Sequence, residues 1–299
     1  MGLVLKNVVK VFEEKTAVDS ISFTLDKPCI FGLLGTNGAG KTTTIRMLLG
    51  ILKKDSGDIL WNGKEVKRET VNFGYLPEER GIYQKTKVYE QIMYFAELKG
   101  MDKKTADKEI KRWAKELKVE EYLDMKAEKL SKGNQQKIQL VTALIHNPDL
   151  LVLDEPFSGL DPVNAEILKN ILLDLVNKGK YIIMSSHQMT SIEEFCTEVL
   201  ILNKGKTVIK GNLNKIKNQY KSNRLEIITN QDIKKYIEEL NLKIEKTMDF
   251  SYYIKLENEE TAHKLLKKII ENNMEVIKFE MKKPTLNDIF IEKVGEIDE

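Results

Sequence analysis

The residues best suited to chemistry form a glycine-rich run at positions 35–42, which reads Gly-Thr-Asn-Gly-Ala-Gly-Lys-Thr. This run matches the phosphate-binding pattern G-x-x-x-x-G-K-[ST], and it lies between an apolar segment, 29–34, and a segment with helical spacing, 43–49. Glycines allow backbone N–H groups to turn toward phosphates, and the following helix directs its positive end at the same charge. The run therefore predicts a nucleoside triphosphate site. The alternative is a turn that only joins a strand to a helix.

Within this run, Lys41 is expected to reach the β- and γ-phosphates, and the hydroxyl of Thr42 is expected to hold Mg²⁺. A phosphate loop alone does not identify the reaction. The residues that we expect around the nucleotide are Gly35, Thr36, Asn37, Gly38, Ala39, Gly40, Lys41, Thr42 and Thr43.

A pair of acids follows a second apolar run, at positions 150–153. Because a continuous apolar run is typical of a strand buried on both faces, Asp154 and Glu155 are expected at the carboxyl end of a strand. Asp154 is suited to hold Mg²⁺ from the outer shell, and Glu155 to polarise a water molecule for attack on the γ-phosphate. The alternative is that these acids only cap a helix. The phosphate loop favours the catalytic interpretation.

Residues 130–137, Leu-Ser-Lys-Gly-Asn-Gln-Gln-Lys, resemble the signature loop of the ATP-binding cassette (ABC) proteins. Other segments resemble further elements of this family and occur in the family's order, from about Leu3 to Gly211. They are Phe12 for the aromatic residue that stacks on adenine, 75–78 for the loop that joins the catalytic core to a helical subdomain, 158–161 for a loop at the dimer contact, and 185–187 for the switch histidine.

The resemblance implies that two cassettes close head to tail around two ATP molecules. Ser131 and Gly133 of one subunit then contact the γ-phosphate bound to the phosphate loop of the other, and Asp161 lies at the contact between the subunits. It also implies that His187 hydrogen-bonds the γ-phosphate and that Glu78 coordinates Mg²⁺. The implied cofactors are ATP and Mg²⁺, and the implied partner is a second copy or a paralogous cassette. The alternative roles of Ser131 and Gly133 are a helix N-cap and a turn residue.

Two positions depart from the family's pattern. Glu78 stands where a glutamine is usual, and Ser131-Lys132-Gly133-Asn134 stands where two adjacent glycines and a glutamine usually follow the serine. The carboxylate of Glu78 is still able to coordinate Mg²⁺, but it adds negative charge near the γ-phosphate. Neither departure removes a group that the chemistry needs.

Length and composition fit this interpretation. The 299 residues, 41% of them hydrophobic, allow two domains. The 48 basic and 46 acidic residues are interspersed and leave a net charge of +2, so no nucleic-acid partner is expected. We expect no membrane span and no signal peptide, and we expect Cys29 and Cys196 to be reduced core thiols of a cytosolic protein. A membrane role then requires a separate chain.

The chain is predicted to be an α/β protein with two domains. Residues 1–212 form a P-loop NTPase cassette whose helical subdomain spans about 87–130, and residues 213–299 form an accessory domain. The second region is predicted as β-α-β-β-α-β, the ferredoxin-like order, with a closing helix over 286–294. Its predicted strands span 224–229, 243–248, 252–256 and 275–282, and its predicted helices span 231–240 and 260–272. Residues 284–290 resemble the tail of single-cassette ATPases of sodium-efflux and drug- or antibiotic-resistance exporters. For this domain we expect a dimer-stabilising or regulatory role, with ligand sensing as the alternative.

These features predict the ATP-hydrolysing subunit of an ABC transporter. Through the resemblance we expect it to dimerise on ATP, to drive a separate integral-membrane permease in export, and to lie on the cytoplasmic face of the membrane through that permease. One alternative is a cassette ATPase that acts on ribosomes or nucleic acid, but the chain lacks the second cassette or the long coiled coil of those relatives. A P-loop kinase is disfavoured by the signature segment.

Overall fold

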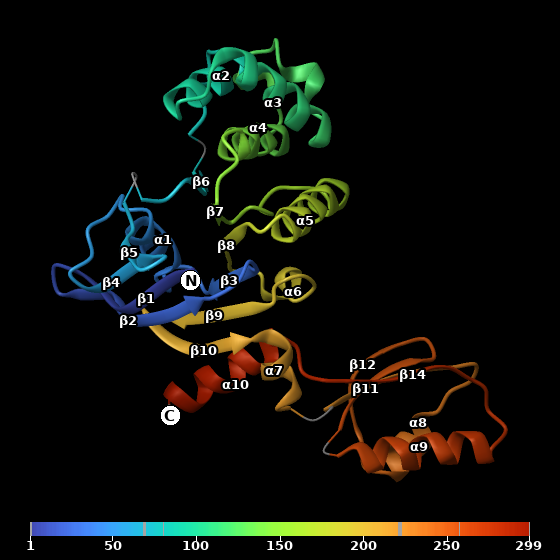
Figure 1. The fold of residues 1–299 in the computed structure, drawn as a ribbon. Helices are drawn as coiled ribbons and strands as arrows, with labels where there is room; N and C mark the ends of the chain where they lie inside the picture. The colour runs from blue at the N-terminus through green and yellow to red at the C-terminus, as the bar shows by residue number, and fades with distance from the viewer. Residues whose placement is uncertain (1, 68–69, 80, 221–222, 257, 299) are drawn as a thin grey trace. The chain divides into compact units, whose positions relative to one another are not determined.

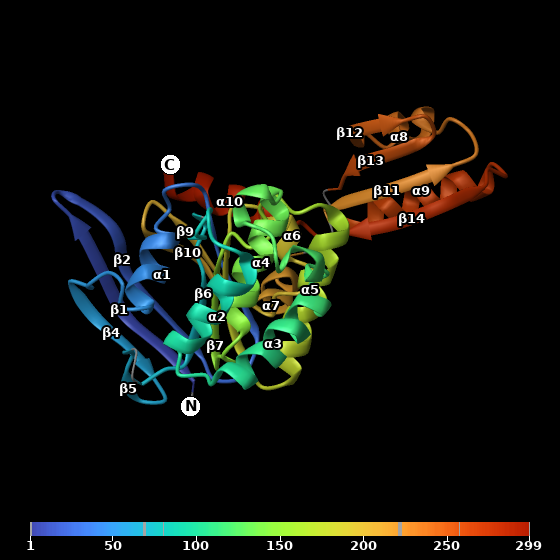
Figure 2. The ribbon, with the colours of Figure 1, turned by 90° about the horizontal axis from the view of Figure 1, so that it is seen from above.

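The computed structural model describes residues 2–67, 70–79, 81–220, 223–256 and 258–298. The chain divides into two compact units, Met1–Gly211 and Asn212–Glu299, which are drawn in Figures 1 and 2 and are described separately below.

The centre of the first unit is a six-stranded sheet with the order β10-β9-β3-β8-β7-β6. The pairs β3–β8, β3–β9, β7–β8 and β6–β7 are parallel, and β3 and β7 are buried along their whole length. Parallel strands place their carboxyl ends at one edge of a sheet, so this edge gathers the ends of β3, β7 and β8. The strands are β3 (Ile30–Gly35), β6 (Phe73–Leu76), β7 (Leu150–Asp154), β8 (Tyr181–Ser186), β9 (Glu198–Asn203) and β10 (Lys206–Asn212).

A second sheet in this unit has the order β2-β1-β4-β5, and all its pairs are antiparallel. Its strands are β1 (Leu3–Phe12), β2 (Lys15–Leu25), β4 (Ser56–Trp61) and β5 (Lys64–Glu65). A hairpin turn at Asn62-Gly63 joins β4 to β5, with φ of 49° and 80° at these residues. The apolar faces of both sheets and helix α1 (Lys41–Leu48) form one core.

The remaining helices of the first unit include a group formed by α2 (Val88–Leu98), α3 (Lys103–Glu116) and α4 (Lys132–Leu144), with the 3-10 turns Glu120–Tyr122 and Ala127–Lys129. Figure 1 shows this group together beyond β6 and β7. Helices α5 (Pro162–Asn177) and α6 (Met189–Ile192) complete the unit. The segment 75–78 is not a loop throughout, because Tyr75 and Leu76 belong to β6 and pair with Val152 and Leu153 of β7.

The second unit contains a four-stranded antiparallel sheet with the order β12-β13-β11-β14. Along the chain its elements follow the predicted β-α-β-β-α-β order: β11 (Arg224–Thr229), α8 (Lys234–Glu239), β12 (Lys243–Met248), β13 (Ser251–Lys255), α9 (Glu259–Glu271) and β14 (Val276–Lys282), flanked by α7 (Leu213–Asn218) and α10 (Leu286–Asp298). Helix α8 is shorter than the predicted helix over 231–240. Its start is displaced because Asp232 Oδ1 accepts hydrogen bonds from the Lys234 N–H and the Tyr252 hydroxyl.

Alternating strand residues separate the faces of this sheet. Leu225, Ile227, Tyr252 and Ile254 face the helices and form an apolar core with α8 and α9. Glu226 is also buried, and its carboxylate accepts hydrogen bonds from Lys278 Nζ at 2.8 Å and from the Tyr253 hydroxyl at 3.2 Å, while Lys282 Nζ lies 2.5 Å away. The two lysines lower the pKa of Glu226 to about 2. The second unit therefore has its own core and a paired buried charge.

Candidate nucleotide site

The glycine-rich run forms the connection from β3 to α1. Lys41 is the first residue of α1, and its ammonium group donates hydrogen bonds to the carbonyl oxygens of Gly35 at 2.8 Å and Thr36 at 3.1 Å. Gly35 has φ of 147°, and a Cβ there would lie 2.4 Å from the Leu202 carbonyl oxygen on β9. Only glycine fits this position, so the loop packs closely against the sheet. The side chain of Lys41 folds back onto the carbonyl groups of the loop.

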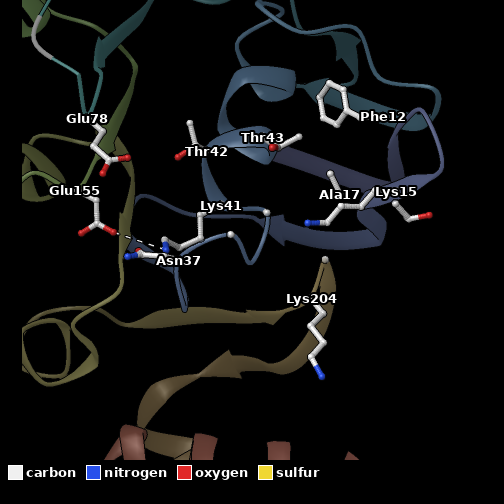
Figure 3. A pocket seen from close by; sticks show the side chains of 14 residues that line it. Phe12, Lys15, Ala17, Asn37, Lys41, Thr42, Thr43, Glu78, Glu155 and Lys204 are labelled. Atoms are coloured by element: carbon white, nitrogen blue, oxygen red, sulfur yellow. Dashed lines mark ion pairs between the residues drawn. The ribbon is translucent and has the colours of Figure 1, made fainter. Parts of the chain in front are cut away.

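A cavity of about 570 Å³ lies beside this loop. Figure 3 shows Glu78 and Glu155 on one side of the cavity and Phe12 on the other, with Lys41 and Thr42 between them. The cavity thus combines an exposed aromatic ring, residues of the glycine-rich loop and two acids from distant parts of the chain. Its lining consists of Phe12, Lys15, Thr16, Ala17, Asn37, Gly38, Gly40, Lys41, Thr42, Thr43, Glu78, Glu155, Lys204 and Gly205.

The two acids after β7 lie in different environments. Asp154 is 1% exposed, and its Oδ1 accepts a hydrogen bond of 2.5 Å from the Ser185 hydroxyl on β8. Glu155 is 8% exposed, with Oε1 3.8 Å from Lys41 Nζ and Oε2 3.0 Å from His187 Nδ1. Glu155 therefore lies between the phosphate-loop cation and a half-exposed histidine, within reach of a group held at the loop.

Three oxygen-bearing side chains predicted to hold Mg²⁺ meet at a neighbouring cavity. Thr42, Glu78 and Asp154 line this cavity, which has a volume of about 590 Å³ and also touches Phe12. Asp154 Oδ2 is buried without a hydrogen-bond partner among the described residues. A hydroxyl and two carboxylates are donors suited to a hard cation, and an unpaired buried carboxylate oxygen leaves room for one. The residues present fit Mg²⁺.

Tyr75 on β6 lines the same cavity. Burial raises the pKa of its hydroxyl, and the charge of nearby Asp154 raises it further. Tyr75 is therefore a neutral neighbour of the acidic cluster at physiological pH.

Seven residues expected at the nucleotide or at the dimer contact lie outside the first cavity's lining, and one of them is His187, which contacts Glu155. Gly35 and Thr36 contribute carbonyl oxygens to Lys41, and Ala39 is buried. Ser131 is the N-cap of α4, where its hydroxyl accepts a hydrogen bond from the Asn134 N–H at 3.3 Å, and Asp161 caps α5 through the Asn164 N–H at 3.0 Å. A Cβ on Gly133 would lie 3.4 Å from the Gly159 carbonyl oxygen. The signature segment and the 158–161 loop are therefore neighbours, apart from the chain's own cavity.

Several lining residues were not predicted from the sequence. Lys15, Thr16 and Ala17 come from β2, and Lys204 and Gly205 come from the turn between β9 and β10. Nothing in their local sequence indicates a ligand, because they reach the loop only through pairing of distant strands. Gly205 has a partial signal, since its N–H donates to the Ala39 carbonyl oxygen at 3.1 Å and no larger residue fits its φ of 81° without strain.

A parallel sheet that leads through a glycine-rich loop into a helix, with acids at the end of a neighbouring strand, defines a P-loop nucleoside triphosphatase. The ABC transporter family matches residues 18–158, and the C-terminal domain family of DrrA1-3-like ATP-binding proteins matches residues 211–294.

Individual relatives extend this match. The chain is 44% identical over 300 residues to the ABC transporter ATP-binding protein YhaQ of Bacillus subtilis (strain 168). This alignment covers 99% of the chain and 100% of YhaQ. It is 30% identical over 230 residues, 75% of the chain, to the lipopolysaccharide export system ATP-binding protein LptB of Haemophilus influenzae, and covers 95% of that protein. A solved ATP-binding subunit of an ABC transporter superposes with a TM-score of 0.68, at 29% identity over 73% of the chain and 93% of that structure.

The chain belongs to the ATP-binding proteins of ABC transporters, and it is the ATPase subunit of such a transporter. Among the described residues, no helix has the length and apolarity needed to cross a bilayer. The same residues contain no group of three or more histidine, cysteine or acidic side chains arranged around a metal.

Proposed function

We propose that Glu155 polarises the water that attacks the γ-phosphate of ATP, and that His187 hydrogen-bonds the same phosphate. The observation that carries this proposal is the position of Glu155 beside the phosphate loop, where Oε1 lies 3.8 Å from Lys41 Nζ and Oε2 lies 3.0 Å from His187 Nδ1. Phe12, 45% exposed at the opposite side of the cavity, supplies a face on which adenine stacks. The remaining loop residues bind the phosphates through their backbone N–H groups and through the ammonium of Lys41.

Mg²⁺ is the second part of this proposal. Thr42, Glu78 and Asp154 are the residues that hold it, Asp154 through Oδ2, which has no partner in the part of the chain that the structure describes. The bound cation neutralises charge on the phosphates during hydrolysis.

We further propose that hydrolysis requires two cassettes. Ser131, Gly133 and Asp161 lie outside the chain's own cavity, and Ser131 and Gly133 lie at the N-terminus of α4, a 13-residue helix whose positive end suits a phosphate of a second copy. A homodimer or a dimer with a paralogous cassette satisfies this arrangement.

We propose that the permease binds in a groove of about 900 Å³ between α2, α4 and β6. Apolar side chains such as Phe95 and Leu98 line it together with Gln91 and His146, and Gln91 Nε2 and His146 Nδ1 are buried without partners among the described residues. Burial is the main cause that lowers the pKa of His146 to about 4, so the ring is neutral. Because the Phe73 carbonyl only accepts, His146 Nε2 donates to it and Nδ1 is left as an acceptor. The groove suits an apolar segment carrying one donor and one acceptor.

The wider assignments rest on the same family. We propose residues 1–212 as the nucleotide-binding domain with a helical subdomain at about 87–130, and residues 213–299 as a ferredoxin-like accessory domain, which the strand order β12-β13-β11-β14 supports. Export is supported by relatives such as LptB, whose name states an export system. We place the protein on the cytoplasmic face of the membrane, held there by its permease.

The Glu155→Gln variant tests the catalytic assignment. The substitution keeps the size of the side chain but removes its charge, so ATP binding should persist while turnover falls by about 100-fold or more. The ATP-bound variant should elute as a dimer on size exclusion. Turnover close to that of the natural protein would contradict the role of Glu155.

The Leu98→Glu variant tests the groove. Leu98 is 64% exposed in the groove lining, and a carboxylate there opposes docking of an apolar segment. Recovery of the permease with the tagged subunit should fall at least about fivefold, with ATP binding unchanged. Leu173→Glu, at a 37% exposed position of α5 outside the groove, is the control. Equal recovery with both variants would place the permease elsewhere.

A further inference from the structure

The backbone at Glu155 has an unusual conformation. Its φ is 53°, in the left-handed region that residues other than glycine rarely adopt. A residue held in this region persists only where its surroundings fix it, and such residues concentrate at functional sites. The groups that hold Glu155 in place therefore determine where its carboxylate points.

One side of the Glu155 peptide is held by β8. The Glu155 N–H donates to the Ser185 hydroxyl oxygen at 3.0 Å. The carbonyl side is held by α4 and by the following turn, because Gln136 Nε2 donates to the Pro156 carbonyl at 2.5 Å and the Ser158 N–H donates to the Glu155 carbonyl at 3.1 Å. Ser185 is thus the side chain that fixes the amide end of this peptide.

The same hydroxyl also fixes Asp154. Ser185 Oγ donates a hydrogen bond to Asp154 Oδ1 at 2.5 Å, and the two residues are register partners on β8 and β7. Ser185 is 0% exposed, so no bulk water is available to replace these bonds. With Oδ1 occupied, Asp154 Oδ2 is the oxygen left without a partner among the described residues, and it belongs to a residue that lines the Thr42 and Glu78 cavity.

We propose that Ser185 is a positioning residue for the hydrolysis of ATP. One hydroxyl orients the carboxylate of Asp154 toward Mg²⁺ and fixes the backbone from which Glu155 reaches the γ-phosphate. This inference rests on the proposed roles of Asp154 and Glu155. It assigns Ser185 no contact with nucleotide or metal.

The consequence of removing the hydroxyl follows from its two bonds. In Ser185→Ala, the carboxylate of Asp154 loses its donor and is free to rotate, and the Glu155 N–H is left buried without an acceptor. Metal binding and turnover should both suffer. The phosphate loop keeps its own contacts, because Lys41 bonds to Gly35 and Thr36 independently of Ser185. Binding of nucleotide without metal should therefore be preserved.

The experiment compares Ser185→Ala, Ser185→Thr and the control Ser22→Ala in the full chain. Ser22 also accepts a backbone N–H, that of Asn7 at 2.7 Å, but it lies on β2 outside both cavities. Affinity for a fluorescent ATP analogue is measured with Mg²⁺ and with EDTA, and ATP turnover is measured separately. For Ser185→Ala we expect EDTA affinity within about twofold, an Mg²⁺-dependent gain in affinity reduced about tenfold, and turnover reduced about tenfold or more.

Ser185→Thr keeps a hydroxyl and should recover most of the Mg²⁺-dependent gain, whereas Ser22→Ala should match the natural protein. The proposal is overturned if Ser185→Ala matches Ser22→Ala in both measurements. It is also overturned if EDTA affinity falls as much as Mg²⁺ affinity, since the effect is then a general disturbance of the site. Failure of the underlying assignment is distinguishable, because Glu155→Gln would then turn over ATP normally whatever the result at Ser185.

Discussion

Buried charges are treated differently in the two units of the chain. In the first unit, Asp154 is buried, and one of its carboxylate oxygens has no hydrogen-bond partner among the described residues, while Glu155 is buried in the lining of a cavity beside Lys41. In the second unit, Glu226 is buried and receives hydrogen bonds from Lys278 and Tyr253, with Lys282 alongside. Unpaired buried oxygen is costly unless a ligand satisfies it, whereas full pairing suits a purely structural role. Among the described residues, the buried carboxylate of Glu226 is therefore satisfied within its own unit, whereas Asp154 keeps one oxygen available for a ligand.

The largest effect is expected for Leu265→Ala, which tests whether the two units are stable independently of each other. Leu265 is 0% exposed in the core of the second unit, and its truncation should destabilise that unit by about 2–5 kcal/mol. If the two units keep separate cores, ATP affinity in the first unit should not change. Differential scanning calorimetry and nucleotide titration measure the two effects.

The control for this variant lies on the same helix. Ile270→Ala removes a comparable side chain that is 59% exposed, so its effect should stay within about 0.5 kcal/mol. Loss of ATP affinity in Leu265→Ala but not in Ile270→Ala would mean that the units depend on each other.

The contrast also explains how far the sequence could lead. Motif residues such as Lys41 and Asp154 were predictable because a contiguous pattern fixes their type and their place, Lys41 at the start of a helix and Asp154 at the end of a strand. Strands β11 and β12 begin and end at the predicted residues, 224–229 and 243–248. These features are local, and local sequence determines them.

Features created by long-range pairing were not predictable in the same way. Lys15 and Lys204 reach the cavity from β2 and from the β9–β10 turn, and the double role of Ser185 depends on its register opposite Asp154. Helix α5 (Pro162–Asn177) was not expected either, although Asp161 and Pro162 form a recognisable start signal of N-cap and first-turn proline. The assignment of 75–78 as a loop was wrong for Tyr75 and Leu76 because pairing with β7 makes them an edge strand.

A smaller effect is expected from Glu78→Gln, which tests whether Glu78 contributes to the proposed Mg²⁺ site of the first unit. Glu78 lines both cavities but is exposed, so solvent screens its charge. Glu78→Gln should weaken the apparent Mg²⁺ affinity about two- to fivefold, because an amide attracts the cation less than a carboxylate does. ATP binding without metal should be unchanged or slightly better, since a charge that repels the γ-phosphate is lost.

A Mg²⁺ titration of ATPase activity at fixed ATP measures this effect. Glu79→Gln is the matched control, because Glu79 is the exposed neighbour of Glu78 and also lines the second cavity, but is not among the residues that we propose to hold Mg²⁺. Superimposable curves for Glu78→Gln and the natural protein would remove Glu78 from the metal site. Equal shifts in both variants would show general electrostatics rather than coordination.

The smallest effect concerns the fully paired charge of the second unit. The folded pKa of Glu226 is lowered from 4.5 to about 2, so its contribution to stability is present above the unfolded pKa and is lost as pH falls from about 4.5 toward about 2. Both lysines are about 40% exposed, which screens the interaction and limits the contribution to about 1 kcal/mol or less. Glu226→Gln should therefore lower the melting temperature at neutral pH and flatten its acid dependence.

Calorimetry between pH 2 and 7 tests this prediction. The unfolding transition of the second unit is the one that shifts in Leu265→Ala. Glu271→Gln is the control, since Glu271 is exposed on α9 and its ion pair with Lys267 spans 3.7 Å. At low pH the melting temperature of this control should follow that of the natural protein, because an exposed ion pair contributes little to stability. If the melting temperatures of Glu226→Gln and the natural protein depend on pH in the same way, the lysines surround Glu226 without stabilising its charge. The contrast between the two units would then rest on Asp154 alone.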